Sequence, residues 1–164
     1  DAEFQGLEIE IDWLAMENPG WNLLLSTYGD ILRGKNKTEG GNLPRIPAGS
    51  LGVGFEIQAE KLSFGLDLNN VFKQNKIAVH EEEEEEHGHE EEEHGHEHGE
   101  TATPSYSLLN AYASYDLNFG NSQGELFVRG TNLTDELALV HTSFLKNSAP
   151  LPGRSFEVGL KFDF

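Results

Sequence analysis

A run of histidine and glutamate between His80 and Glu100 contains most of the residues in this chain that could do chemistry. It holds six of the seven histidines and twelve of the 29 acidic residues, so most of the formal net charge of −18 is local. Neutral imidazole binds Zn²⁺, Ni²⁺ and Cu²⁺ well, and carboxylates can complete the coordination shell. The run therefore predicts capture of divalent metal, with candidate ligands His80, His87, His89, His94, His96, His98, Glu90 and Glu97.

The spacing of the histidines favours loose capture over one rigid site. Pairs such as His87 and His89 are two residues apart, which puts their imidazoles on the same side of an extended chain. Zn²⁺ takes four ligands, and the run can supply them in many combinations. The run has no apolar side chains to bury, so we expect it to be disordered without a ligand. Ordering it costs about 1–2 kcal/mol per residue, which weakens each individual site.

Two questions about the run stay open. A solvated acidic spacer is the alternative to metal binding, although the interspersed histidines favour a metal. Ca²⁺ prefers oxygen ligands alone and gives no reason for the histidines. The general order of affinities favours copper over zinc, so the residues of the run do not identify the metal.

Candidates outside the run are fewer. His141 is a possible second metal ligand lining an inner vestibule, or a structural histidine. Asp30, Glu56, Asp67 and Asp116 fall on one face of predicted strands, where they could guide a cation or simply line a wet lumen. No nucleophile motif, paired carboxylates or phosphate-binding loop is present, so we predict no enzyme, no catalytic residues and no cofactor-binding residues.

Composition excludes several classes of protein. The chain has no cysteine, which rules out disulfides and thiolate metal sites. Its negative charge makes nucleic acid an unsuitable partner. It contains no signal-peptide pattern and no apolar run of about 18 residues, which argues against a helical membrane protein but leaves a membrane β-barrel open.

Alternation of apolar and polar residues, typical of strands with two different faces, recurs along the chain. In residues 7–13, for example, every second residue is apolar and the others are acidic. We expect seven strands, beginning near Phe4, Trp21, Ser50, Leu62, Tyr106, Glu125 and Arg154. The facing of the strand from Glu125 is ambiguous, because three successive residues, Leu126, Phe127 and Val128, are apolar.

The connections between these strands alternate in length. Short turns are expected near Pro19, Glu60 and Asn121, and long loops at 34–48, 73–104 and 141–153. In an antiparallel up-and-down sheet the long loops share one rim, which is the asymmetry of outer-membrane barrels. The predicted fold is therefore an all-β, antiparallel up-and-down transmembrane β-barrel segment, with a soluble sandwich as the alternative. Aromatics expected near the short-turn rim, as in a membrane-interface girdle, are Trp13, Trp21, Phe119, Phe162 and Phe164.

Several stretches carry a family resemblance. Residues 129–136 (RGTNLTDE) resemble a stretch near the end of TonB-dependent receptors, and the apolar alternation ending in Phe164 resembles the terminal signal of outer-membrane barrels. Residues 41–47 (GNLPRIP), 144–146 (FLK) and 149–154 (APLPGR) are similar to the zinc-receptor branch of that family. A His- and acid-rich outer loop is common in that branch.

The resemblance implies that residues 1–164 are the C-terminal part of a receptor barrel, about seven strands of 22, with residues 73–104 as an extracellular His/Glu-rich loop. An odd strand number also indicates a segment of a larger barrel. The implied location is the outer membrane of a Gram-negative bacterium, and the implied cargo is zinc or a similar divalent metal. Implied partners are outer-membrane lipid, the barrel assembly machinery, the rest of the barrel, its plug domain and the TonB complex.

The plug and the energy-coupling box are not in this sequence, so the chain alone is not expected to transport. Two alternatives to zinc uptake stay open. One is a receptor of the same family for haem or a metal chelate, for which histidines can supply axial ligands. The other is a non-transporting surface barrel or adhesin whose acidic loop serves interaction only.

Overall fold

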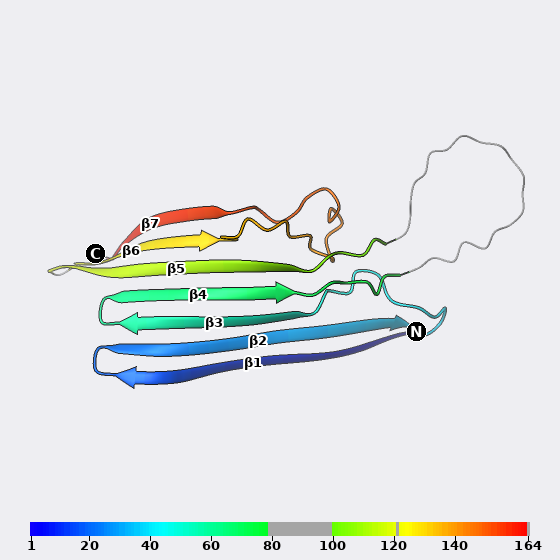
Figure 1. The fold of residues 1–164 in the computed structure, drawn as a ribbon, viewed down its shortest axis with the longest axis horizontal. Helices are drawn as coiled ribbons and strands as arrows, with labels where there is room; N and C mark the ends of the chain where they lie inside the picture. Colours follow the sequence, from blue (N-terminus) through cyan, green and yellow to red (C-terminus); the bar gives the residue numbers. More distant parts are fainter. Residues whose placement is uncertain (79–99, 121, 164) are drawn as a thin grey trace, which may run out of the picture.

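The structure, a computed structural model, describes residues 1–78, 100–120 and 122–163. These residues form one seven-stranded antiparallel sheet in which each strand pairs with its sequence neighbours (Figure 1). The prediction of an all-β, antiparallel up-and-down fold is confirmed. The strands are β1 (Ala2–Asn18), β2 (Trp21–Asn36), β3 (Ser50–Ala59), β4 (Leu62–Val71), β5 (Tyr106–Phe119), β6 (Ser122–Thr131) and β7 (Ser155–Asp163).

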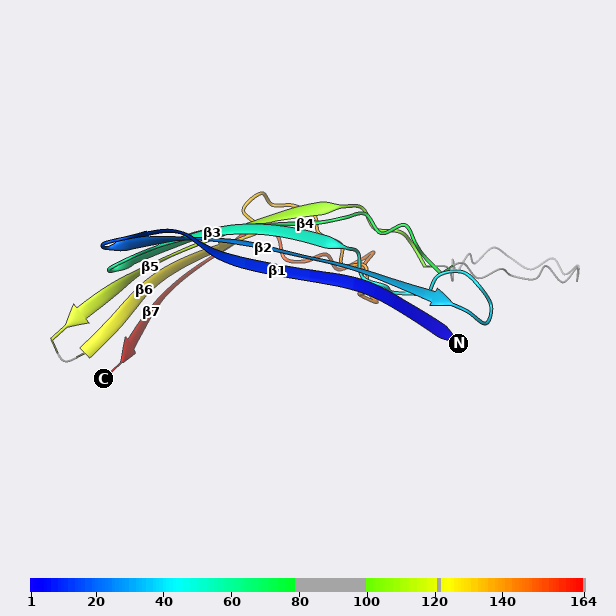
Figure 2. The ribbon, with the colours of Figure 1, turned by 90° about the horizontal axis from the view of Figure 1, so that it is seen from below.

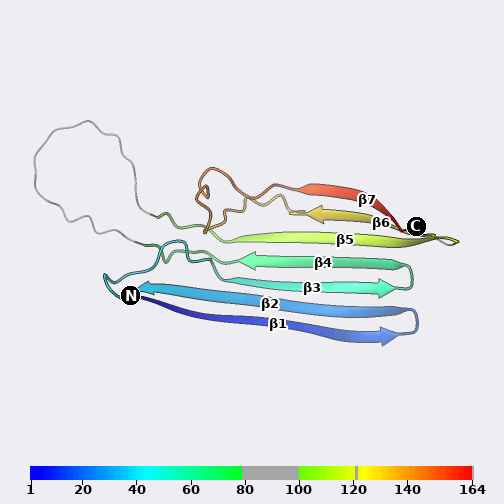
Figure 3. The same ribbon diagram turned by 180° about the vertical axis from the view of Figure 1, so that it is seen from behind.

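The connections divide between the two ends of the sheet as predicted. The turns after β1 and β3 and the described residues of the turn after β5 lie at one end, with the C-terminus. The connections 37–49 and 132–154 and the described residues of the connection 72–105, which are 72–78 and 100–105, lie at the other end with the N-terminus (Figure 3). Three predicted boundaries were wrong. The first long connection begins at 37 instead of 34, because β2 extends to Asn36. β6 begins at Ser122, three residues before the predicted start at Glu125, because Ser122 already pairs with Phe119. The last long connection begins at Asn132 instead of 141, because β6 ends at Thr131.

The sheet is bent into an arch when seen along its edge (Figure 2). Directly paired residues of antiparallel strands project to the same side, so the register defines its two faces. One face carries rows such as Ile11, Thr27, Val53, Leu68 and Leu109. Its apolar side chains are largely exposed, with Leu7 and Val158 both at 70%. A continuous exposed apolar surface of this kind is suited to contact with lipid.

The opposite face is polar and predominantly acidic. The register places Asp30, Glu56, Asp67 and Asp116 together on it, as the sequence predicts. The register also resolves the facing of β6: Val128 pairs with Val158 on the apolar face, and Phe127 pairs with Gly159 on the polar face. A side chain at Gly159 would collide with the Phe127 ring, since a Cβ there would lie 2.2 Å from ring carbon Cζ. Gly159 thus lets a large apolar ring lie flat on the polar face.

Of the aromatic residues predicted near the short-turn rim, the four described ones are exposed: Trp13, Trp21, Phe119 and Phe162. Phe119 and Phe162 also pack together, with ring centroids 5.8 Å apart. Phe164 lies outside the described residues. No helix in the described part of the chain is long and apolar enough to cross a membrane.

The buried core lies at the end of the sheet that bears the long connections. Within the described ranges, the buried apolar residues are Ile46, Tyr106 and Ala138. The buried polar residues are Gln74, Thr103, Asn132, His141 and Lys146. All of them belong to the long connections or, in the case of Tyr106, to the adjoining end of a strand. The long connections are therefore packed against one another, and this packing positions the candidate site.

Candidate functional site

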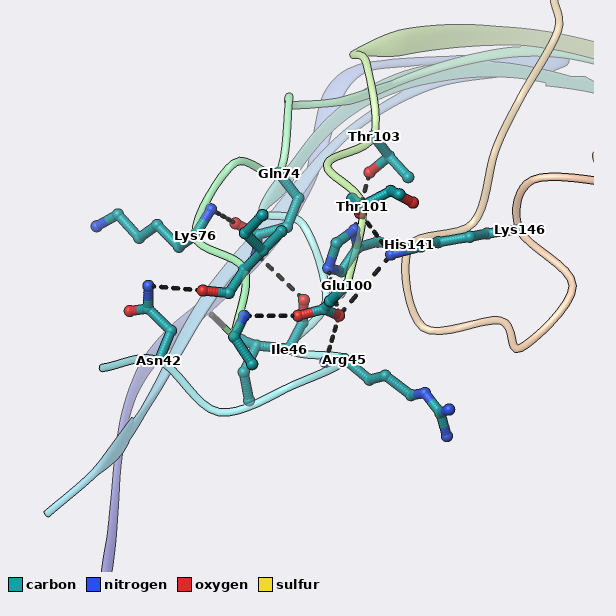
Figure 4. A network of polar contacts seen from close by, with 12 residues as sticks. Asn42, Arg45, Ile46, Gln74, Lys76, Glu100, Thr101, Thr103, His141 and Lys146 are labelled. Carbon is teal, nitrogen blue, oxygen red and sulfur yellow. Dashed lines mark hydrogen bonds and ion pairs between the residues drawn. The ribbon is translucent and has the colours of Figure 1, made fainter. Parts of the chain in front are cut away.

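The candidate site is the junction of the three long connections, at the two ends of the segment that carries the His/Glu run (Figure 4). Gln74 and Thr103 close this segment with a pair of backbone hydrogen bonds, 3.1 and 3.0 Å long. The Gln74 amide nitrogen also donates to the carbonyls of Ile46, at 3.1 Å, and Pro47, at 3.0 Å. Gln74 thus ties both ends of the segment to the connection 37–49.

Glu100 lies at the centre of the junction and is the last residue of the His/Glu run (Figure 4). Its carboxylate accepts hydrogen bonds from the backbone N–H of Arg45, at 2.7 Å, and of Ala78, at 2.9 Å. Lys146 Nζ lies 3.8 Å from Glu100 Oε1, and only 9% of the Glu100 side chain is exposed. Burial alone raises the pKa of this carboxyl, but the two N–H donors, with His141 and Lys146, outweigh it and lower the pKa below the usual value. Glu100 is therefore a fixed anion at neutral pH.

His141 lies against Glu100, and its side chain is only 1% exposed. Its Nδ1 is 3.1 Å from Thr103 Oγ1, which is hydrogen-bond distance. Its Nε2 lies 3.1 Å from Glu100 Oε1, an ion-pair distance, but the two atoms do not make an aligned hydrogen bond. Burial lowers the pKa of His141, as does Lys146, and the opposing effect of Glu100 is smaller. Burial and Lys146 therefore both favour the neutral form of the imidazole.

A cavity of about 490 Å³ opens beside these groups. Glu100 and His141 line it, together with residues from all three long connections. Its two other charged side chains are engaged elsewhere. The Arg45 guanidinium carbon lies 3.1 Å from the ring centroid of Phe144, a cation–π contact. Lys146 Nζ donates to the carbonyl of Thr101 at 2.6 Å.

The stretch 129–136 has a structural role beside this junction. Asn132 is 4% exposed and has a φ of 49°, a left-handed conformation that asparagine tolerates better than most residues. Its amide donates to the carbonyls of Glu136, at 2.9 Å, and Pro152, at 3.2 Å, and accepts from the Glu136 N–H at 2.8 Å. Asp135 accepts from the Arg154 N–H at 2.9 Å. These two residues fold the connection that carries His141 and Lys146.

A second hollow, of about 400 Å³, lies on the polar face of the sheet. Glu56 and Asp67 line it, whereas Asp30 and Asp116 lie outside it. The Tyr28 hydroxyl lies 3.1 Å from Asp67 Oδ2, and the Tyr28 ring lies over Gly52, where a Cβ would come within 2.1 Å of it. The Tyr28 hydroxyl thus donates to one of the four carboxylates that could guide a cation or simply line a wet lumen.

Most sequence-predicted ligands lie outside the described residues: His80, His87, His89, Glu90, His94, His96, Glu97 and His98. His141 is described, and it lies in the loop junction. Within residues 1–78, 100–120 and 122–163, no group of three or more histidine or acidic side chains could hold a metal ion.

Sequence reasoning missed Glu100, Thr103 and Lys146 as partners of His141. The available signal was the set of family-like stretches, because Arg45 lies in GNLPRIP and Lys146 in FLK, and both contact Glu100. Stretches 100 residues apart in sequence thus converge on one carboxylate.

No known protein-family profile matches the chain. Among solved structures, the chain is similar to the copper transporter OprC, with a TM-score of 0.71 and 20% sequence identity. The match covers 99% of this chain but 23% of the OprC chain, so the chain spans about a quarter of the length of that transporter. The likeness shows the fold: seven up-and-down strands that match a barrel segment.

Proposed function

We propose that this chain is the C-terminal barrel segment of a TonB-dependent outer-membrane receptor that takes up a divalent transition metal, with zinc as the leading candidate. The His/Glu-rich segment captures the ion outside the cell, at the mouth of the barrel. Transport requires the rest of the barrel, the plug and the TonB complex, so the chain alone does not transport.

One observation carries the proposal: the fastening of both ends of the metal-ligating run to the long-connection end of a barrel-like sheet. Glu100 and the Gln74–Thr103 pair hold these ends in place. In outer-membrane barrels the long connections face the outside. The exposed apolar face supports a lipid environment, and the acidic face supports a lumen that attracts cations.

Copper is a second candidate cargo, favoured by the likeness to a copper transporter. Cu²⁺ generally binds nitrogen and oxygen ligands more tightly than Zn²⁺, so a higher affinity for copper would not show that copper is the cargo. Measured uptake into cells distinguishes the two metals. Cells that express the native-length protein should accumulate zinc in an energy-dependent manner when zinc is scarce. Accumulation of copper alone would change the cargo, and no metal accumulation would contradict the proposed function.

The capture step has its own test. Purified protein in detergent should bind several Zn²⁺ per chain at neutral pH and lose them below about pH 6.5, as imidazoles protonate. Replacing the six histidines of residues 80–98 by glutamine should remove most of these ions. Replacing Glu81–Glu86 by glutamine is the matched control, because it alters six side chains and keeps every imidazole. Equal loss in both variants would contradict capture by histidine.

A further inference from the structure

We propose that Glu100 and His141 form a binding site for one divalent cation at the loop junction. This site would accept an ion that the histidines of the His/Glu run have captured. This inference rests on the proposed function for its cargo, but the site itself is defined by described residues alone. Glu100 is the last residue of the run, and both ligands of the site are held by hydrogen bonds.

The first observation is the distance between the two donor atoms. His141 Nε2 and Glu100 Oε1 are 3.1 Å apart. Two atoms that each bind one Zn²⁺ at about 2.0–2.1 Å lie about 2.9 Å apart at a right angle and about 3.3 Å apart at a tetrahedral angle. The pair therefore already has the separation of two ligands of one ion, and binding requires little movement.

The second observation is that the buried Nε2 makes no aligned hydrogen bond, although Glu100 Oε1 lies 3.1 Å from it. If Nδ1–H donates to Thr103 Oγ1, Nε2 bears a lone pair that faces a carboxylate oxygen, which is unfavourable without a cation between them. A hydrogen bond from the other ring nitrogen is the arrangement that orients histidine ligands in metal sites. Thr103 is itself 2% exposed, so its hydroxyl is held in place.

The cavity completes the site. Two protein ligands leave coordination positions open, and the adjoining space of about 490 Å³ admits water or a further donor such as Ser143 or Asn147 on its wall. An anion is a poorer occupant, because Arg45 stacks on Phe144 and Lys146 already contacts Glu100. A site with few protein ligands holds its ion weakly, which suits transfer more than storage.

The Lys146 ammonium competes with the cation for Glu100 Oε1. Its ammonium lies 3.8 Å from the same Glu100 oxygen that faces His141, so an incoming ion and this ammonium repel each other. Replacing Lys146 with methionine should therefore tighten cation binding. A lysine that only supported the fold would leave binding unchanged or weaken it.

The test uses the native-length protein in detergent with the six histidines of residues 80–98 replaced by glutamine, titrated with Zn²⁺ and, for its visible spectrum, Co²⁺. One ion should remain per chain. Glu100→Gln and His141→Gln should each weaken it at least tenfold, and Lys146→Met should tighten it threefold or more. Thr103→Val should weaken it about tenfold, whereas Thr103→Ser should retain it.

Two results would overturn the site. One is residual binding that neither Glu100→Gln nor His141→Gln alters, and the other is no residual ion in the background that keeps Glu100, His141 and Lys146. Lys146→Met leaves Glu100 and His141 unchanged, so its effect on cation binding still tests the site if Glu100→Gln disrupts the junction. Metal uptake by cells is measured separately. An intact site without uptake would contradict the proposed function alone, and uptake without the site would contradict this inference alone.

Discussion

Asn132→Asp tests whether one buried amide holds together the connection that carries His141 and Lys146. The substitution keeps the shape of the side chain and the oxygen that accepts from the Glu136 N–H. It removes the nitrogen that donates to the carbonyls of Glu136 and Pro152. A carboxylate oxygen then faces two carbonyl oxygens in a site that is 4% exposed.

The expected cost follows from these contacts. Two lost hydrogen bonds are worth about 0.5–1.5 kcal/mol each, and unsatisfied buried carbonyls add to this, so the connection should open more easily by at least about 2 kcal/mol. Because about 1.4 kcal/mol corresponds to a factor of ten, local amide hydrogen exchange should accelerate by about 30-fold. The Leu151 N–H, bonded to the Ala138 carbonyl at 2.9 Å, is a suitable probe.

An exposed asparagine of β5 provides the control for Asn132→Asp. Asn118→Asp introduces the same charge at an exposed position of β5 and should leave exchange at Leu151 unchanged. Lowering the pH should reduce the Asn132→Asp defect, because a protonated carboxyl regains one donor. Equal exchange in the two variants at neutral pH would show that the Asn132 amide does not hold the connection.

Two further predictions concern the sheet. Gly52→Ala should displace the Tyr28 ring, because the new Cβ would lie 2.1 Å from it, and a changed Tyr28 fluorescence or ring NMR signal would show this; an unchanged signal would contradict the packing. Val53→Lys, on the exposed apolar face, should destabilise the protein in lipid by about 2–4 kcal/mol if it lies at mid-membrane. Ser26→Lys on the polar face is its control, and equal denaturant midpoints for the two lysine variants would contradict the assignment of faces.

Much of the fold follows from local sequence. Strict alternation, as in residues 7–13, requires a strand with one apolar and one polar face because side chains repeat every two residues. Short turns such as Pro19-Gly20 and long polar stretches then determine which connections share an end. The pairing of β1 with β2, β3 with β4 and β5 with β6 follows as well, because neighbours joined by short turns pair directly. The three pairings across the long connections agree with the predicted up-and-down order. The facing of β6 did not follow, because Phe127 lies on the polar face only where Gly159 leaves room for its ring.

The contacts of the candidate site did not follow from local sequence. Composition alone predicts the His/Glu run as a metal ligand, since imidazole and carboxylate can bind metal in any conformation. The junction required the tertiary structure, because Glu100 meets Arg45 and His141 across 55 and 41 residues of sequence. Local periodicity carries no information about such contacts.

The sequence by itself determined the alternation of faces and the two classes of connection, and it predicts metal binding by the run, because each depends on residue type and near-neighbour spacing. Only the tertiary structure decided that His141 is buried, that Thr103 occupies one of its nitrogens and that Glu100 lies beside the other. The physical reason is that these properties arise from packing three long connections together. Burial and partner atoms, which set the protonation and reactivity of a histidine, exist only once that packing has formed.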